Sequence, residues 1–178
     1  IENLVNEFSD FARMPKPIFK KNDLLNIINE NIKLLKEIDL TIDINFHYKK
    51  DTILFNCDSE QMSRVFFNLI KNSIESIQEK DTKSPNFIKK IDIVIANKSD
   101  YIEIVITDNG IGFSEKNLNN ILKPYFTTKS KGSGLGLSIV NKIINDHNGS
   151  IKFVQQNTGA KIIVKFSKNV DWDINYWW

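Results

Sequence analysis

A long stripe of apolar residues at helical spacing constrains the fold of this chain more than any other feature of its sequence. The stripe follows Asp58 and Gln61, whose identities and spacing are those of a capping box at a helix N-terminus. Apolar residues then recur every three or four positions, as they do on one face of an α-helix. They are Met62, Val65, Phe66, Leu69, Ile70, Ile74 and Ile77. Such a helix must bury its apolar face against a second layer of structure.

Segments with strand periodicity can supply that second layer. Apolar and polar residues alternate in them, so that one face of each strand is apolar. The predicted strands are 41–48, 53–56, 91–96, 101–107, 151–155 and 161–166. We expect the two pairs that are closest in sequence, the third with the fourth and the fifth with the sixth, to form hairpins.

Two further main helices complete the predicted architecture. One is expected over about 22–35 with Asn22 as its N-cap, and the other over about 135–146, while a weak helix is expected near 118–122. Together these patterns predict an α+β fold. The expected form is a two-layer sandwich in which a mixed, mostly antiparallel sheet packs against three main helices.

Length and composition fit one folded domain with short appendages. The chain has 178 residues, of which 41% are hydrophobic and 26% charged. Apolar residues at helical spacing near the start, followed by two prolines, predict a helix that ends at a stiff hinge. We expect residues 1–17 to be this helix end and hinge, 18–168 to be the folded domain and 169–178 to be a tail. Because the first residue is not Met, we also expect a fragment of a longer protein.

Composition disfavours several classes of function. The chain has no run of about 18 apolar residues, so no segment is expected to cross a membrane. The single cysteine, Cys57, excludes an internal disulfide and favours a reducing, cytoplasmic environment. The net charge is only +2 and the lysines alternate with acidic residues, so a nucleic-acid partner is not expected.

The long helix carries a polar stripe opposite its apolar face. Arg64, Asn68, Lys71, Asn72 and Glu75 are three or four residues apart and therefore share one face. Amide oxygens, a carboxylate and a lysine in one line could hold a hydrated Mg²⁺ ion and phosphate groups. The alternative is an ordinary solvated helix face.

A short glycine-containing segment, Asp108-Asn109-Gly110-Ile111-Gly112-Phe113, directly follows a predicted strand. The carboxylate of Asp108 could accept a hydrogen bond from an amino group such as that of adenine. The two glycines would let the backbone approach a flat ring. The alternative is a plain Asp-Asn-Gly turn.

A second glycine-rich segment, Gly132-Ser133-Gly134-Leu135-Gly136-Leu137, leads directly into a predicted helix. Backbone N–H groups at a helix N-terminus favour anions. The glycine spacing matches neither the dinucleotide-binding fingerprint nor the P-loop, so both of those nucleotide sites are excluded. Residues 123–129, with aromatic, hydroxyl and lysine side chains, suit a lid over a nucleotide.

Four motifs in order resemble the N, G1, F and G2 boxes of the ATP-binding catalytic domain of bacterial sensor histidine kinases, in the GHKL superfamily. They are Asn68-x-x-x-Asn72, Asp108-x-Gly110-x-Gly112, Tyr125-Phe126-Thr127-Thr128-Lys129 and Gly132-x-Gly134-x-Gly136. The resemblance covers about residues 22–166. Residues 4–17 also resemble the end of the second dimerisation helix in nitrogen-regulation, NtrY-like sensor kinases.

The resemblance implies a Bergerat fold that binds ATP and Mg²⁺. It implies that Asp108 binds the adenine amino group and that Asn72 ligates the metal, with Asn68 nearby. The implied catalytic residues are Asn68, Lys71 and Lys129, of which the two lysines would contact phosphates. The implied ATP-binding residues are Asn68, Asn72, Asp108, Gly110, Ile111, Gly112, Phe113, Thr127, Thr128, Lys129, Gly132, Ser133, Gly134, Leu135, Gly136 and Leu137.

By the same resemblance, the expected activity is transfer of the ATP γ-phosphoryl group to a histidine on a dimerisation domain outside this chain. The expected partners are that domain and a response regulator, and the full-length protein would be a homodimer. Related ATPases have a glutamate where this chain has Asn68, and an amide cannot act as a base for water. Position 160 is Ala where the family often has Thr. The alternatives are a non-enzymatic ATP-sensing module and another ATPase or kinase of the superfamily.

Neither histidine of the chain is expected to accept the phosphoryl group. His47 is in a predicted strand, and His147 is at the end of a predicted helix, where a cationic cap would be favourable. We therefore expect that the isolated chain binds ATP without labelling itself.

Overall fold

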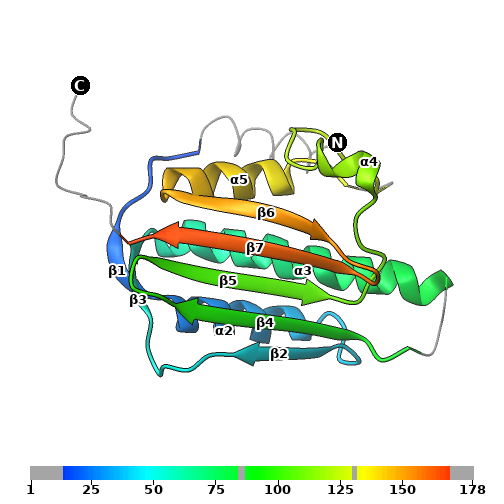
Figure 1. The fold of residues 1–178 in the computed structure, drawn as a ribbon, viewed down its shortest axis with the longest axis horizontal. Coiled ribbons are helices and arrows are strands. Elements are labelled where there is room, and N and C mark those ends of the chain that lie inside the picture. The colour runs from blue at the N-terminus through cyan, green and yellow to red at the C-terminus, as the bar shows by residue number, and fades with distance from the viewer. Residues whose placement is uncertain (1–13, 84–86, 130–131, 169–178) are drawn as a thin grey trace.

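The computed structural model describes residues 14–83, 87–129 and 132–168. The helix expected at the start of the chain lies almost entirely outside these residues, as does the tail. Figure 1 shows one sheet with the long helices on one of its faces. This arrangement confirms the predicted α+β two-layer sandwich. No helix within the three described ranges is both long and apolar enough to cross a membrane.

The main sheet has five strands in the order β2-β4-β5-β7-β6. Only β2 and β4 are parallel, and each of the other neighbouring pairs is antiparallel. The bounds of the strands are β2 Asp43–His47, β4 Lys90–Asn97, β5 Tyr101–Asp108, β6 Gly149–Gln155 and β7 Ala160–Ser167. A separate two-stranded sheet pairs β1 (Lys20–Asp23) with β3 (Leu54–Cys57).

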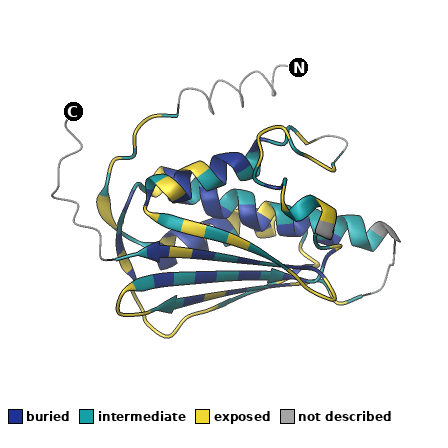
Figure 2. Cartoon of the chain, turned by 45° about the horizontal axis from the view of Figure 1, so that its top comes forward, coloured by how far each residue is buried: buried dark blue, intermediate teal, exposed yellow. Residues whose placement is uncertain are grey.

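Three long helices cover one face of the sheet: α2 (Leu24–Lys36), α3 (Ser59–Lys83) and α5 (Gly136–Asp146). Apolar residues of these helices and alternate residues of the central strands are buried together between the two layers, as Figure 2 shows. In β5, for example, Ile102, Ile104 and Ile106 are buried, as their period of two requires. This core fixes α3 across the back of the sheet.

The N-terminal ends of two helices differ from the expected caps. Asp23, not Asn22, caps α2, and its carboxylate accepts hydrogen bonds from Leu25 N at 3.1 Å and Ile53 N at 3.0 Å. Asn22 instead belongs to β1, which the sequence did not predict because its four residues, KKND, include no apolar one. The carboxylate of Asp58 accepts a hydrogen bond from Gln61 N at 3.0 Å as expected. The Gln61 side chain does not accept from Asp58 N, which donates to His147 Nε2 instead, and Gln61 Nε2 donates to Pro15 O. The capping box is therefore only half formed.

The weak helix also differs from its prediction. The structure has a single turn, α4 (Glu115–Leu118), and residues 119–124 form turns and a bend where helix was expected near 118–122. Ser114 occupies the N-cap position of this turn.

His147 caps the C-terminal end of α5 as expected, but the expected positive charge is wrong. The ring is fully buried, and burial lowers the pKa of the imidazole, so it is neutral at pH 7. Nε2 accepts a hydrogen bond from Asp58 N at 3.0 Å, which leaves Nδ1 to donate to Ile143 O at 2.8 Å. His147 therefore connects the C-terminal end of α5 to the N-terminal end of α3. His47 lies on β2 as expected, with Nε2 3.5 Å from a carboxylate oxygen of Asp92.

Candidate nucleotide-binding site

A cavity of about 750 Å³ lies between α3, the end of β5 and the segment that leads into α5. It gathers most of the residues that the sequence singled out. These are Asn68, Lys71, Asn72, Asp108, Ile111, Gly112, Phe113, Thr127, Thr128, Lys129, Gly132, Ser133, Gly134, Gly136 and Leu137. Two predicted residues, Gly110 and Leu135, do not line it. Leu135 is fully buried in the core, and Gly110 packs against α3.

Asp108 is the buried acceptor of the cavity. It is the last residue of β5 and only 4% exposed. Its Oδ1 accepts hydrogen bonds from Gly110 N at 2.9 Å and from Ala160 N at 3.3 Å. Burial raises the pKa of the carboxyl group above its usual range, while these N–H groups and the Ser73 hydroxyl act against the rise. The site therefore holds a carboxylate where desolvation is costly, which is typical of a recognition or reactive group.

Close backbone approach explains the glycines that follow Asp108. Gly112 has a φ of +74°, and a Cβ there would lie 2.3 Å from Gly159 O. A Cβ on Gly110 would lie 2.3 Å from Ser76 Oγ, which accepts a hydrogen bond from Ile111 N at 3.1 Å. The turn after β5 is thereby held directly against α3. The alternative of a plain Asp-Asn-Gly turn does not describe this segment, because the segment also packs on α3.

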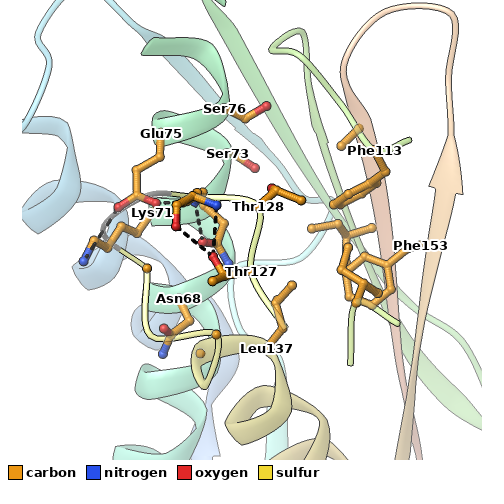
Figure 3. Close-up of a pocket in the computed structure, with 18 of the residues that line it drawn as sticks. Asn68, Lys71, Ser73, Glu75, Ser76, Phe113, Thr127, Thr128, Leu137 and Phe153 are labelled. Carbon is orange, nitrogen blue, oxygen red and sulfur yellow. Dashed lines mark hydrogen bonds and ion pairs between the residues drawn. The ribbon is translucent and has the colours of Figure 1, made fainter. Parts of the chain in front are cut away.

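The polar stripe of α3 faces the cavity and binds the ammonium group of Lys129. Lys129 Nζ donates to Asn72 Oδ1 at 3.1 Å and forms a short ion pair with the Glu75 carboxylate. Lys71 Nζ lies 3.8 Å from the other carboxylate oxygen of Glu75. Figure 3 shows Lys71 and Glu75 on one side of the cavity. An amide oxygen and a carboxylate that already share an ammonium ion are a donor set that fits Mg²⁺.

Asn68 is one turn before Asn72 on the same face. Its Nδ2 donates to Arg64 O at 2.8 Å, so the amide is fixed in orientation. A Cβ on Gly136 would lie 3.0 Å from Asn68 Oδ1, which explains why the first residue of α5 is a glycine. The amide oxygen of Asn68 is therefore held beside the start of α5.

The segment before α5 is folded on itself at the rim of the cavity. Lys129 N donates to Thr127 Oγ1 at 3.0 Å, and a Cβ on Gly132 would lie 2.7 Å from the same oxygen. Gly134 has a φ of +71°, and a Cβ there would lie 2.4 Å from the carbonyl carbon of Tyr125. The glycine-rich segment thus packs on the residues that precede Lys129. This contact brings two predicted motifs together.

An apolar wall faces the charged side of the cavity. The rings of Phe113 and Phe153 meet edge to face with centroids 5.3 Å apart, and Figure 3 places both opposite Glu75, with Leu137 below. Ile111 also contributes to the lining and is partly exposed. Apolar and aromatic walls with a few fixed polar groups are typical of sites for small planar ligands.

Sequence reasoning missed several lining residues: Ser73, Ser76, Phe153 and Ile162. It grouped Glu75 with the polar stripe but did not place it in the site. The two serines could have been found, because they follow Asn72 by one and four positions on the same helix. Nothing in the sequence near Phe153 indicates that this strand residue faces the cavity.

Comparison with known proteins gives the family. Residues 57–170 match the model of the family described as histidine kinase-, DNA gyrase B-, and HSP90-like ATPase. The match includes every predicted site residue and more than half of the chain. This chain belongs to that ATPase family. Within the family, ATP is therefore the nucleotide expected in the cavity.

Among curated relatives, this ATPase domain is similar to sensor histidine kinases. It is 35% identical over 167 residues to the NtrY-like sensor histidine kinase of Rickettsia prowazekii, covering 93% of this chain and 27% of that protein. It is 34% identical over 157 residues to the nitrogen regulation protein NtrY of Azorhizobium caulinodans, covering 85% and 20%. The chain therefore spans about a quarter of the length of these relatives, and they bear out the resemblance to NtrY-like kinases.

Among solved structures, the ATPase domain is similar to the catalytic domain of histidine kinase ThkA in a nucleotide-free form. The TM-score is 0.74 at 28% identity, and the match covers 85% of this chain and 96% of that one. It also matches ThkA in the crystal structure with the response regulator protein TrrA, with a TM-score of 0.76 at 25% identity. That match covers 94% of this chain and 47% of the ThkA chain. The fold is thus the fold of a histidine kinase catalytic domain.

Proposed function

We propose that this domain binds ATP with Mg²⁺ and, in the longer protein, transfers the γ-phosphoryl group to a histidine of a dimerisation domain. The observation that carries the proposal is the division of one cavity into two sides. A buried acceptor, Asp108, and an apolar wall suit a purine base, whereas Asn72, Lys71 and Lys129 suit a metal-bound polyphosphate. Membership of the ATPase family supports the same ligand.

In this proposal the base end of the cavity selects adenine. Asp108 accepts a hydrogen bond from the amino group of the base. Ile111, Phe113 and Leu137 pack on the ring, and Gly112 lines the cavity beside them, while Gly110 lets the turn after β5 pack against α3. Because two backbone N–H groups fix Asp108 Oδ1, the carboxylate needs no rearrangement to receive the base.

At the phosphate end, Asn72 would hold Mg²⁺ with Asn68 nearby, and the bound ion would supply charge neutralisation to the phosphate groups. Lys71 and Lys129 would each place an ammonium group near the phosphates, and the backbone of residues 132–134 and 136–137 would line their path. Lys129 must first leave Asn72 and Glu75, to which it is bound in this structure. Thr127 orients the backbone N–H of Lys129 and so sets where that side chain starts.

An amide at position 68 favours phosphoryl transfer to an acceptor over hydrolysis of ATP. The residue one turn before Asn72 is Asn68, and its amide cannot take a proton from water at neutral pH. A phosphoryl acceptor must then bring its own nucleophile, as a histidine ring would. The similarity to ThkA bound to a response regulator supports a relay onward to such a regulator.

We further propose that residues 18–168 form the catalytic unit, that it works in the cytoplasm and that the full-length protein is a homodimer.

Incubation with radiolabelled ATP and Mg²⁺ tests the proposal, with and without a separately supplied dimerisation domain that contains an acceptor histidine. We expect label on the added domain and none on this chain. Transfer should be slow, because no tether raises the effective concentration of the acceptor. Label on this chain that is lost on substitution of His47 would contradict the assignment. ATP binding without transfer to any acceptor would favour the alternative, a module that senses ATP.

A further inference from the structure

Ser73 presents a buried hydroxyl group to which the described part of the fold gives no hydrogen bond of ordinary geometry. The residue is on α3, directly after Asn72, and is 2% exposed. Its Oγ has no hydrogen-bond partner of ordinary length and angle in the described part of the chain. Ser73 lines the cavity, and Figure 3 shows its hydroxyl directed into that space. A buried hydroxyl without a partner destabilises a fold, so its retention points to a ligand.

The position of this hydroxyl relative to Asp108 defines what it could bind. It lies near enough to the carboxylate to favour the ionised form of Asp108. Oδ1 of Asp108 is occupied by Gly110 N and Ala160 N. Ala160 contributes its backbone N–H but no side-chain hydroxyl. The floor of the cavity therefore offers an acceptor, Asp108 Oδ2, beside a donor, Ser73 Oγ.

We propose that Ser73 is a second base-recognition residue, whose hydroxyl donates a hydrogen bond to ring nitrogen N1 of adenine, directly or through one water. The inference rests on the proposed binding of ATP. Adenine carries its N6 amino donor next to the N1 acceptor, which matches Asp108 beside Ser73. Guanine carries an acceptor and a donor in the opposite order, so its O6 would face the carboxylate. Ser73 thus supplies from α3 the polar contact that the side chain of Ala160 lacks.

The test compares ADP with 1-deaza-ADP, in which N1 is replaced by a CH group, by calorimetry. For the unsubstituted chain we expect ADP to bind about fivefold or more tightly than the analogue, the ratio that a hydrogen bond of about 1 kcal/mol gives. In Ser73→Ala the ratio should fall to about twofold or less. Ser63→Ala removes a hydroxyl on the same helix that bonds Asn31 outside the cavity, and the ratio should remain that of the unsubstituted chain.

The folding of the variant is a separate readout. Because the Ser73 hydroxyl makes no hydrogen bond of ordinary length and angle with the described residues, Ser73→Ala should have a Tm close to that of the unsubstituted chain. Equal binding of ADP and 1-deaza-ADP by the unsubstituted chain would overturn the role of Ser73 while leaving ATP binding in place. An unchanged ratio in Ser73→Ala would do the same. Failure of the unsubstituted chain to bind ADP at all would overturn the proposed function itself.

Discussion

Asp108 allows adenine recognition to be tested with almost no change of shape. In Asp108→Asn the amide oxygen can still accept from Gly110 N and Ala160 N, so the turn after β5 should be kept. The amide nitrogen would then oppose the amino group of the base, donor against donor. We expect ATP affinity to fall at least about tenfold, or about 1.4 kcal/mol, as measured by calorimetry.

A matched control for this change is Asp92→Asn, because Asp92 is a β4 carboxylate that pairs with Lys90 away from the cavity. Its ATP affinity should equal that of the unsubstituted chain. Two results would contradict the role of Asp108: unchanged affinity in Asp108→Asn, or equal affinity of the unsubstituted chain for ATP and GTP.

Glu75 holds both lysines that are proposed to contact phosphates, and it adds a negative charge beside them. In Glu75→Gln we expect Mg²⁺-free ATP to bind about three- to tenfold more tightly, because the ammonium groups become available and one repulsion is removed. The control is Glu103→Gln, which breaks a comparable pair with Lys165 on the sheet. Weaker binding of Mg²⁺-free ATP by Glu75→Gln would show that Glu75 positions Lys129 and does not compete for it.

Among single residues, the sequence predicted those that belong to a recognisable motif. It missed those that reach the cavity only because of where the fold places them. Asp108 and Asn72 could be found because glycines and a second amide stand at fixed spacing around them. Ser73 could have been placed near the site from its position next to Asn72, but its role could not be assigned, because that role depends on a carboxylate that is 35 positions away in sequence and adjacent only in the fold. Phe153 reaches the cavity only through the pairing of β6 with β7.

Between elements, the contact of His147 with Asp58 N makes the junction of α5 and α3 sensitive to pH. Burial lowers the pKa of His147 below its ordinary value of 6.5. The unfolded chain therefore takes up a proton near pH 6.5 that the folded chain does not. The contribution of neutral His147 to the stability of the folded chain is fully present above pH 6.5, and it is lost as the pH falls below that value. We expect this group to make the free energy of unfolding decrease as the pH falls below about 6.5, with a slope of at most about 1.4 kcal/mol per pH unit.

Urea unfolding at several pH values measures this slope. His147→Gln should lower the slope in that range even if it also lowers stability at pH 7. The pKa of Asp58 is lowered, so its own contribution is lost only in a more acidic range. A slope that does not depend on His147 would contradict the neutral, buried state of the ring.

The elements themselves were predictable where their apolar periodicity was strong. The stripe of α3 and the alternation in β5 gave both helix and strand nearly to their ends. β1 has no such pattern, because it is held by backbone pairing with β3 and by the Asn22 side chain on Cys57 O. The cap at Asp23 was missed for the same reason: Asp23 belongs to a strand that pairing, and not composition, defines.

For the whole molecule, the two layers could be predicted from the sequence, but the contacts between segments far apart in the sequence could not. Alternating strands and amphipathic helices require a sandwich, and the described residues form one. The sequence could not show that Lys129 would lie on Asn72 and Glu75, because that contact joins a turn-rich segment to a helix more than fifty residues before it. Only the assembled sheet and helices bring them together.

The parallel pairing of β2 with β4 has a consequence for how fast this chain folds. Asp43 pairs with Lys90, so the intervening residues, including all of α3, form one long loop that must close. The β4–β5 and β6–β7 hairpins close over far shorter loops. Loop closure over long separations slows folding, so β2 should join the sheet late. No residue of β2 (Asp43–His47) lines the cavity, so nucleotide should bind before this slowest step is complete.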